Sequence, residues 1–221
     1  MLRFDTVIGD LPLLLLGIPL TLGITAVAFI VGTVAALPIA TLRIAGPGVL
    51  GSIARGWVEF FRTTPPLMHI AWAYYALPVI ANIRLDAFTV VAGALACSTS
   101  AVMSEIFRGG ILAVPRGQWD ASQVLGLTWV QRLRWVVLPQ TLRVILAPSC
   151  NALVGLLKQS SLAAVIAVPE IMNRGMILAS QTFRPIEVLT LVALIYFGLT
   201  WPLVLLSGSL ERRTSLAFHV D

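Results

Sequence analysis

Charged residues are scarce in this sequence of 221 residues: they make up 11% of it, whereas hydrophobic residues make up 58%. This balance lies outside that of a soluble globular domain and indicates a protein whose solvent is the lipid bilayer. The net charge of +5 would raise nucleic acid as a partner in a soluble protein. Here the basic residues stand singly between apolar blocks, so orientation in a membrane explains them better, and no nucleic-acid partner is expected.

Cysteine and histidine are also rare, with two of each. Cys97 and Cys150 lie in apolar stretches without metal-ligand spacing, so we expect packed free thiols rather than a disulfide framework or a zinc site. His69 and His219 have no second histidine or carboxylate at ligand spacing, which favours packed or interfacial side chains. These patterns give no support to hydrolytic metal chemistry.

Long charge-free runs cover residues 11–42, 63–83, 87–104 and 188–210. Each can supply the roughly 20 apolar residues that a membrane-spanning helix needs. The first run is far longer than the apolar core of a signal peptide, so we expect it to be retained as a helix. A fifth apolar stretch, between Arg143 and Glu170, is interrupted by Lys158. The sequence therefore predicts an all-α integral membrane protein with about five transmembrane helices.

The arginines are distributed unevenly if the N-terminus is placed outside. Four would then lie outside: Arg3, Arg84, Arg174 and Arg184. Ten would lie inside: Arg43, Arg55, Arg62, Arg108, Arg116, Arg132, Arg134, Arg143, Arg212 and Arg213. The positive-inside rule then predicts an N-out, C-in protein. Because no repeat or soluble segment is evident, we expect a single membrane domain over residues 1–221.

Residues 105–142, called the coupling segment below, form the longest stretch outside the predicted spans. Two short amphipathic helices are expected at 120–125 and 128–137, with Gly126 allowing the tight turn between them. We expect Pro139 to end the second helix before the next span begins. An alternative is a basic amphipathic segment lying on anionic lipid, but that would not require glycine and proline at fixed offsets.

The coupling segment carries a recognisable pattern: Asp120-Ala121-Ser122, Gly126, Val136, Leu138 and Pro139. It resembles the EAA loop of binding-protein-dependent ABC importers, in which Glu-Ala-Ala is followed at fixed spacing by Gly and then by Ile-x-Leu-Pro. The wider sequence is similar to the polar amino acid permease family (histidine, glutamine and glutamate type). That similarity includes Glu105-Ile106-Phe107-Arg108-Gly109-Gly110, Val114-Pro115-Arg116-Gly117-Gln118 and Leu157-Lys158-Gln159-Ser160-Ser161-Leu162.

Two features depart from the family pattern. Asp120 and Ser122 replace the first Glu and the second Ala of the motif, and Asp120 keeps the carboxylate with a shorter reach. Phe61-Arg62-Thr63-Thr64-Pro65-Pro66-Leu67 stands where many members have Arg-Gly-Thr-Pro-Leu-Leu. We expect the first change to leave docking intact, while the second gives no basis for transferring a substrate preference.

The resemblance implies a permease subunit, in the bacterial cytoplasmic (inner) membrane, of an ATP-driven importer of amino acids or related small polar solutes. It implies that the EAA residues couple to a separate ATPase subunit, most simply a homodimer, which binds ATP and Mg. The chain itself has no Gly-x-x-x-x-Gly-Lys-Ser/Thr phosphate loop, so we expect neither a cofactor nor enzymatic activity in it. A second permease, identical or homologous, and an extracytoplasmic solute-binding protein are the other implied partners.

Lys158, Gln159, Ser160, Ser161 and Glu105 are the candidates for a substrate pathway or gate. Lys158 lies about fifteen residues, or roughly 22 Å of helix, beyond Arg143, which places it in the outer half of its span. A charge at this depth should face protein or water, and we consider a pair with Glu170 or Glu187 that would hold one gate. The alternative is a lysine whose long stem reaches the membrane surface.

Two other functions would also account for a hydrophobic chain. An ATP-independent channel or secondary carrier would explain the spans, but carriers commonly show paired repeats and broken helices, and neither is evident. A membrane enzyme would need facing catalytic groups in its spans, and such groups are almost absent. The permease interpretation therefore has the most support.

Overall fold

The computed structural model describes residues 4–44, 46 and 48–215, and every regular element in this part of the chain is helical. The short elements are the 3₁₀ helices η1 (Phe4–Thr6), η2 (Ile8–Asp10) and η4 (Ser160–Ile166), the helices α1 (Leu11–Leu15) and α7 (Trp129–Gln131), and the π-helix η3 (Arg132–Val137). The longer helices are α2 (Ile18–Ile44), α3 (Val49–Thr63), α4 (Pro66–Ile80), α5 (Ala87–Leu112), α6 (Arg116–Val124), α8 (Leu138–Gln159), α9 (Ile171–Thr182) and α10 (Pro185–Ser215). The all-α prediction is confirmed.

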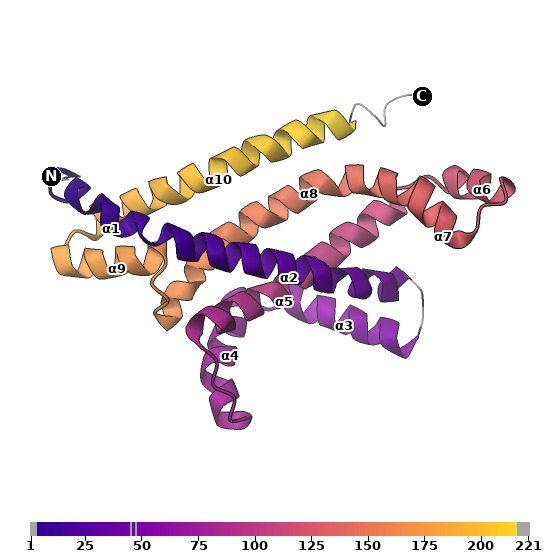
Figure 1. Ribbon diagram of the computed structural model, residues 1–221. Coiled ribbons are helices and arrows are strands. Elements are labelled where there is room, and N and C mark those ends of the chain that lie inside the picture. The colour runs from indigo at the N-terminus through magenta and orange to yellow at the C-terminus, as the bar shows by residue number, and fades with distance from the viewer. Residues whose placement is uncertain (1–3, 45, 47, 216–221) are drawn as a thin grey trace.

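Within the described residues, four helical segments are long and apolar enough to cross a membrane, namely residues 18–44, 87–112, 129–166 and 185–212. They run side by side in an elongated bundle (Figure 1). Helix α1 and helix α9 lie at one end of the bundle, and α6 and α7 extend beyond the other end. The four segments correspond to four of the predicted spans.

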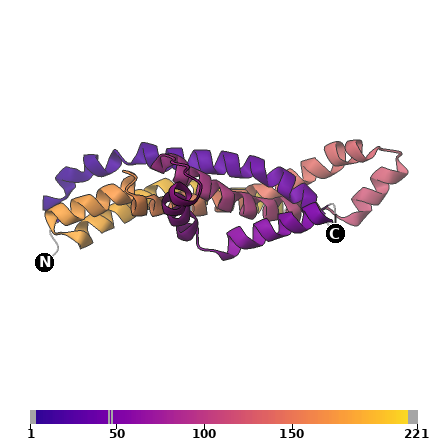
Figure 2. The same cartoon turned by 90° about the horizontal axis from the view of Figure 1, so that it is seen from below.

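The second predicted span, residues 63–83, contains a shorter apolar helix than the other four, namely α4. Helix α4 has 15 residues and therefore rises about 22 Å, short of the roughly 30 Å hydrocarbon core. It leaves the bundle at a steep angle in Figure 1 and points toward the viewer in Figure 2. The expected connection over 43–62 is instead largely helix α3. The number of crossings and their N-out, C-in orientation therefore stay predictions.

The break between α3 and α4 has a local cause. Proline has no N–H to donate and forces the residue before it out of the α-helical region. Thr64, which precedes Pro65, accordingly has an extended backbone with ψ of 134°, and Pro65 itself has ψ of 133°. Helix α4 starts directly afterwards, at Pro66. The result is a helix pair interrupted in the apolar part of the chain, a feature that the sequence pattern did not reveal.

Helix α5 is the centre of the bundle, where it packs against α2, α3, α4 and α8. Its buried positions are mostly small residues, including Ala92, Ala96, Ser100 and Ala101. Helix α2 approaches it so closely that a Cβ atom on Gly32 would lie 2.6 Å from Cβ of Thr99. Small residues at such contacts let helices approach each other in a membrane, where packing rather than hydrophobicity drives association.

The coupling segment differs from its prediction at both ends. Helix α5 continues to Leu112, so Glu105 and Arg108 belong to the membrane bundle and not to the connection. Gly126 has φ of +73°, which confirms the glycine turn. Pro139 does not end the second helix, because it lies in the first turn of α8, which continues directly from the π-helix η3.

The π-helix explains how Pro139 is tolerated. The N–H of Leu138 bonds to the carbonyl of Leu133, five residues back, which is the π-helical register. This wider turn accommodates a proline that would interrupt a regular α-helix. The second arm of the coupling segment is therefore one continuous helix with the span that follows it, from Trp129 to Gln159.

The predicted orientation can be tested by cysteine labelling in intact cells. With Cys97 and Cys150 replaced by serine, a Ser215→Cys variant should resist a membrane-impermeant thiol reagent until the cells are permeabilised, because the C-terminal end of α10 is predicted to be cytosolic. A Gln181→Cys variant on the exposed face of α9 should react at once. Labelling of Ser215→Cys in intact cells would show that the orientation is wrong.

Candidate functional site

The tip of the coupling segment, between α6 and α7, projects beyond the end of the bundle opposite α1 and α9 (Figure 1), and it exposes apolar side chains. Val124 and Leu125 are 87% and 77% exposed, and Trp129 and Val130 on the second arm are also exposed. Clustered apolar groups at a position outside the spans are typical of a surface that contacts another protein. The tip is therefore the part of this chain best suited to contact a partner outside the membrane.

Hydrogen bonds hold the two arms of the tip together. The Arg132 guanidinium donates to Oε1 of Gln123 across the turn, at 3.2 Å. Thr128 and Gln131 form a reciprocal capping box, in which the threonine hydroxyl accepts from the Gln131 N–H and Gln131 Oε1 accepts from the Thr128 N–H. The turn at Gly126 is thus held in one shape, so a force on the tip would reach α8.

The predicted coupling residues occupy two different places. Asp120 and Ala121 are exposed on α6, while Ser122 is buried and donates its hydroxyl to the Trp119 carbonyl at 2.7 Å. Val136, Leu138 and Pro139 lie on the second arm, where η3 joins α8. The motif therefore contributes partly to the exposed surface and partly to the junction with the span.

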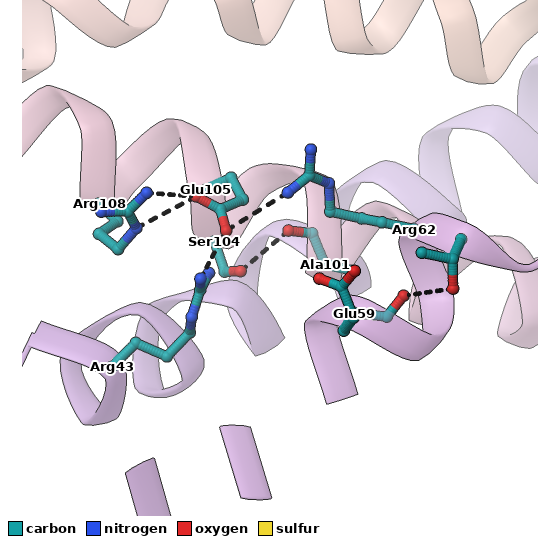
Figure 3. A network of polar contacts seen from close by, with 8 residues as sticks. Arg43, Glu59, Arg62, Ala101, Ser104, Glu105 and Arg108 are labelled. Carbon is teal, nitrogen blue, oxygen red and sulfur yellow. Dashed lines mark hydrogen bonds and ion pairs between the residues drawn. The ribbon is translucent and has the colours of Figure 1, made fainter. Parts of the chain in front are cut away.

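Glu105 lies at the centre of an ion-pair cluster that joins three helices (Figure 3). Its Oε1 lies 2.6 Å from Nη2 of Arg43 on α2 and 3.4 Å from Nη1 of Arg62 on α3. Its Oε2 accepts from both Nε and Nη2 of Arg108, one turn further along α5, at 3.1 and 2.9 Å. One carboxylate thus ties the ends of α2 and α3 to α5.

This cluster carries more positive than negative charge. Three guanidinium groups share one carboxylate, so these four side chains sum to +2. Arg43 is the most buried, with 12% of its side chain exposed, and its Nε and Nη1 atoms are buried without a hydrogen-bond partner. A buried cation that loses its counter-ion is costly, so the Glu105 carboxylate beside Nη2 of Arg43 is needed to hold this arginine in place.

A cavity of about 310 Å³ lies beside the cluster, at the break between α3 and α4. It is lined by Phe61, Arg62, Thr64, Pro66, Ser98, Thr99, Val102, Ala152, Gly155, Leu156 and Gln159. These residues come from the end of α3, the start of α4, the middle of α5 and the outer part of α8. Non-helical backbone within a membrane protein is tolerated where it lines such a cavity.

The predicted pathway residues are only partly brought together. Gln159 lines the cavity. Glu105 is connected to the cavity through its ion pair with Arg62, because Arg62 lines the same cavity. Ser160 is buried and donates to the Leu157 carbonyl, whereas Lys158 is exposed. Ser161 donates to the Lys158 carbonyl at 2.7 Å.

The expected pair between Lys158 and an outer carboxylate is not formed: in the described part of the chain, no ion pair joins Lys158 to Glu170 or Glu187. Glu187 instead lies 3.6 Å from Arg184. Glu170 is fully buried, where its carboxylate caps α9 by accepting from the N–H groups of Met172 and Asn173. It also accepts from the Tyr196 hydroxyl, at 2.6 Å.

The surroundings of Glu170 explain why it needs no lysine. Burial raises the pKa of the Glu170 carboxyl, and the hydrogen bonds that it accepts act in the opposite direction. The Thr21 hydroxyl, 3.4 Å from Oε2, adds a contact from α2. Glu170 thus fastens α9 to α2 and α10, which is a structural role at the end of the bundle away from the coupling segment.

His69 is a packed residue, as expected. It is 9% exposed, and its ring lies 4.7 Å from that of Phe61 and 5.6 Å from that of Phe60, measured between centroids. Its Nδ1 shares a hydrogen bond with the Ser98 hydroxyl at 3.2 Å. His219 lies outside the described residues. Cys97 and Cys150 are half-buried free thiols.

Arg43, Arg62 and Arg108 are the site residues that the sequence pattern did not single out. The sequence indicates them as markers of the inner side, and Arg62 and Arg108 also stand in the stretches compared with the permease family, but none of the three is predicted there as a site residue. Two local features of the sequence could have indicated these arginines. Glu105 and Arg108 stand at helical spacing in an apolar run, and a proline pair closely follows Arg62. The long-range contacts that complete the cluster have no such signal.

Comparison with known proteins identifies the class. Residues 28–216 match the family of binding-protein-dependent transport system inner membrane components. The chain is 34% identical over 206 residues to the probable amino-acid ABC transporter permease protein YckA of Bacillus subtilis, covering 93% of this chain and 91% of that protein. It is 32% identical over 207 residues to the glutamine transport system permease protein GlnP of Escherichia coli, covering 93% and 94%.

Solved structures agree. A crystal structure of an amino acid ABC transporter with histidines matches with a TM-score of 0.90 and 31% identity, over 96% of this chain and 99% of that one. An inward-facing MetNI methionine ABC transporter shares the fold, with a TM-score of 0.77 over 93% of this chain and 98% of that one. The chain belongs to the family of binding-protein-dependent ABC transport permeases. It is therefore a multi-pass inner-membrane transport subunit, as predicted.

Proposed function

We propose that this chain is the permease subunit of an ATP-driven importer that moves amino acids or related small polar solutes into the cytoplasm. The observation that carries the proposal is the shape of the coupling segment. Its tip exposes Val124 and Leu125, and its second arm is continuous with α8. A rigid arm of this kind suits a chain that has no phosphate loop and must receive movement from a separate ATPase.

The proposed mechanism follows from this continuity. ATP and Mg bind to the partner ATPase subunits, most simply a homodimer, and closure of that dimer displaces the docked tip. Because the arm and α8 form one helix, the displacement reaches Gln159, which lines the cavity. The cavity would then open alternately to the two sides of the membrane.

We assign the solute path to the cavity at the break between α3 and α4. Discontinuous helices commonly form solute sites in transporters, and about 310 Å³ falls in the range of small-molecule pockets. The relatives named above are a glutamine permease and a probable amino-acid permease, which supports amino acids as the solute class. Lys158 lies just before Gln159 in the last turn of α8, and Ser160 and Ser161 follow it in η4. We place the outer end of the path there.

Other subunits complete the importer. One chain supplies four apolar helical segments of spanning length and the short helix α4, which is few for enclosing a polar path. A second permease, identical or homologous, would close it, and an extracytoplasmic binding protein would deliver the solute. The binding protein is supported by the family of this chain, whose members are described as components of binding-protein-dependent transport systems.

Transport in proteoliposomes tests this proposal. Vesicles that contain this chain with its ATPase, its second permease and its binding protein should accumulate a radiolabelled amino acid from a panel of the twenty standard ones. Accumulation should require ATP and should be lost when this chain is omitted. Equal accumulation without ATP would contradict the proposal and would support the channel or secondary carrier.

A further inference from the structure

Arg62 belongs to two features at once. Its guanidinium pairs with Glu105 in the ion-pair cluster, and its side chain lines the cavity at the helix break. It stands next to the last residue of α3, two residues before Thr64, where the backbone becomes extended. Figure 3 shows Arg62 reaching toward Glu105 from the side opposite Arg108. Arg62 therefore connects the cavity to the helices that the cluster holds.

Glu105 is well satisfied without Arg62. Arg108 donates two hydrogen bonds to Oε2, and Arg43 lies 2.6 Å from Oε1. Arg62 is the most distant of the three, at 3.4 Å, and its side chain is 49% exposed, against 12% for Arg43. Exposed ion pairs contribute little to stability. Arg62 is thus the arginine that can leave Glu105 at least cost.

The charged and polar residues that line the cavity indicate which chemical group would bind there. Among the described residues that line the cavity, Arg62 is the only charged one, and the polar residues around it are Thr64, Ser98, Thr99 and Gln159. The adjoining cluster has an excess of two positive charges, so a second carboxylate would lower this excess. Guanidinium groups bind carboxylates through paired, charge-assisted hydrogen bonds.

We propose that Arg62 binds the carboxylate of the transported solute, and that it exchanges Glu105 for that carboxylate when the cavity is occupied. This inference rests on the proposed function and narrows it to solutes that bear a carboxylate, such as α-amino acids, and excludes the corresponding amines. Loss of the Arg62–Glu105 pair would release the end of α3 from α5. Solute in the cavity would thereby loosen one of the contacts that hold the bundle in its present arrangement.

The test uses protection of a cysteine in the cavity, so that the selectivity of the binding protein does not interfere. In the complete permease–ATPase complex, with Cys97 and Cys150 replaced by serine, an Ala152→Cys variant places a thiol in the cavity lining. The amino acid that gives the fastest ATP-driven uptake among the twenty standard ones serves as the probe. It should slow the labelling of this thiol, and its decarboxylated amine should not.

The Arg62 variants then separate this role from general damage. Arg62→Met should raise the concentration of amino acid needed for half-protection at least tenfold, and Arg62→Lys should give an intermediate shift. Arg55→Met removes the same charge from an exposed position on the same helix and should leave protection unchanged. Gel filtration confirms that each complex assembles.

Three outcomes would overturn the proposal: equal protection by the amine, unchanged protection in Arg62→Met, or no protection by the transported amino acid. Uptake by the parent complex is measured in the same preparation. If uptake is ATP-dependent while protection does not depend on Arg62, only the role of Arg62 is refuted. If no ATP-dependent uptake occurs, the importer function itself is refuted.

Discussion

Replacing Gly126 with valine is expected to reduce ATP-driven uptake at least roughly tenfold while the complex still assembles. Gly126 has φ of +73°, a region that a β-branched residue enters only at a cost of about 1–3 kcal/mol. No neighbour lies within 4 Å of a Cβ at this position, so the effect would come from the backbone and not from a clash. The turn would change shape, and the tip would no longer transmit movement to α8.

Gly117→Val is the matched control for this variant. Gly117 lies within helix α6 of the same segment, has no positive φ and also has open space around it. It should therefore retain most of the uptake. Uptake is measured in proteoliposomes, and the amount of assembled complex is determined by gel filtration. Normal uptake by an assembled Gly126→Val complex would contradict the proposed coupling role of the turn.

Glu105→Gln is expected to destabilise the chain strongly. It would leave three arginines facing one another without an anion, one of them 88% buried. Removing one partner of a fully buried ion pair costs about 3–5 kcal/mol, and the 21% exposure of Glu105 places this case toward the lower end. The purified complex should therefore unfold at a temperature several degrees lower, as followed by a thermal shift of tryptophan fluorescence.

Glu59→Gln provides the comparison. Glu59 lies one turn before Arg62 on an exposed face of α3 and close to the cluster in Figure 3, but no ion pair in the described part of the chain involves it. Its replacement removes the same charge and should leave the unfolding temperature nearly unchanged. If both variants unfolded at the same temperature, the cluster would have no role in holding α2, α3 and α5 together.

Local rules predicted the elements whose causes are local. The turn at Gly126 could be foreseen because glycine adopts a positive φ without a steric cost, and the long apolar runs gave the spanning helices. The same rules failed at Pro139. A proline ordinarily ends a helix, but the π-helical turn just before it keeps the helix continuous.

Helix α3 was not predicted, because of the arginines in its sequence. Residues 43–62 were interpreted as a connection because basic residues mark the inner side of a membrane. The segment in fact buries Gly51, Ala54 and Val58 at helical spacing and exposes the charged residues on another face. A period of 3.6 residues is therefore a better guide than charge alone in such a segment.

Contacts between distant residues could not be predicted from one sequence. Arg43 and Glu105 are paired because α2 packs along α5, and that packing depends on small residues spread over both helices. Glu170 and Glu187 were both considered as partners of Lys158, but the carboxylate of Glu170 accepts hydrogen bonds from N–H groups of α9 and from the Tyr196 hydroxyl instead. Three-dimensional proximity, and not spacing along the chain, decides these partners.

Because of the break between α3 and α4, a broken helix can no longer be used to distinguish a secondary carrier from an ATP-driven permease. Broken helices were expected only for a secondary carrier, yet the chain contains one at Thr64 and Pro65. The feature is compatible with the proposed solute path and does not indicate how transport is powered. The power source must be tested through the coupling segment.

The most direct test is the ATPase activity of the reconstituted complex in the presence of its solute-loaded binding protein. We predict that loaded binding protein stimulates ATP hydrolysis when this chain is present. Stimulation should disappear when the chain carries Gly126→Val but persist with Gly117→Val. Stimulation that is the same with wild-type and Gly126→Val chains, or that needs no copy of this chain, would contradict the claim that the coupling segment links ATP hydrolysis to transport.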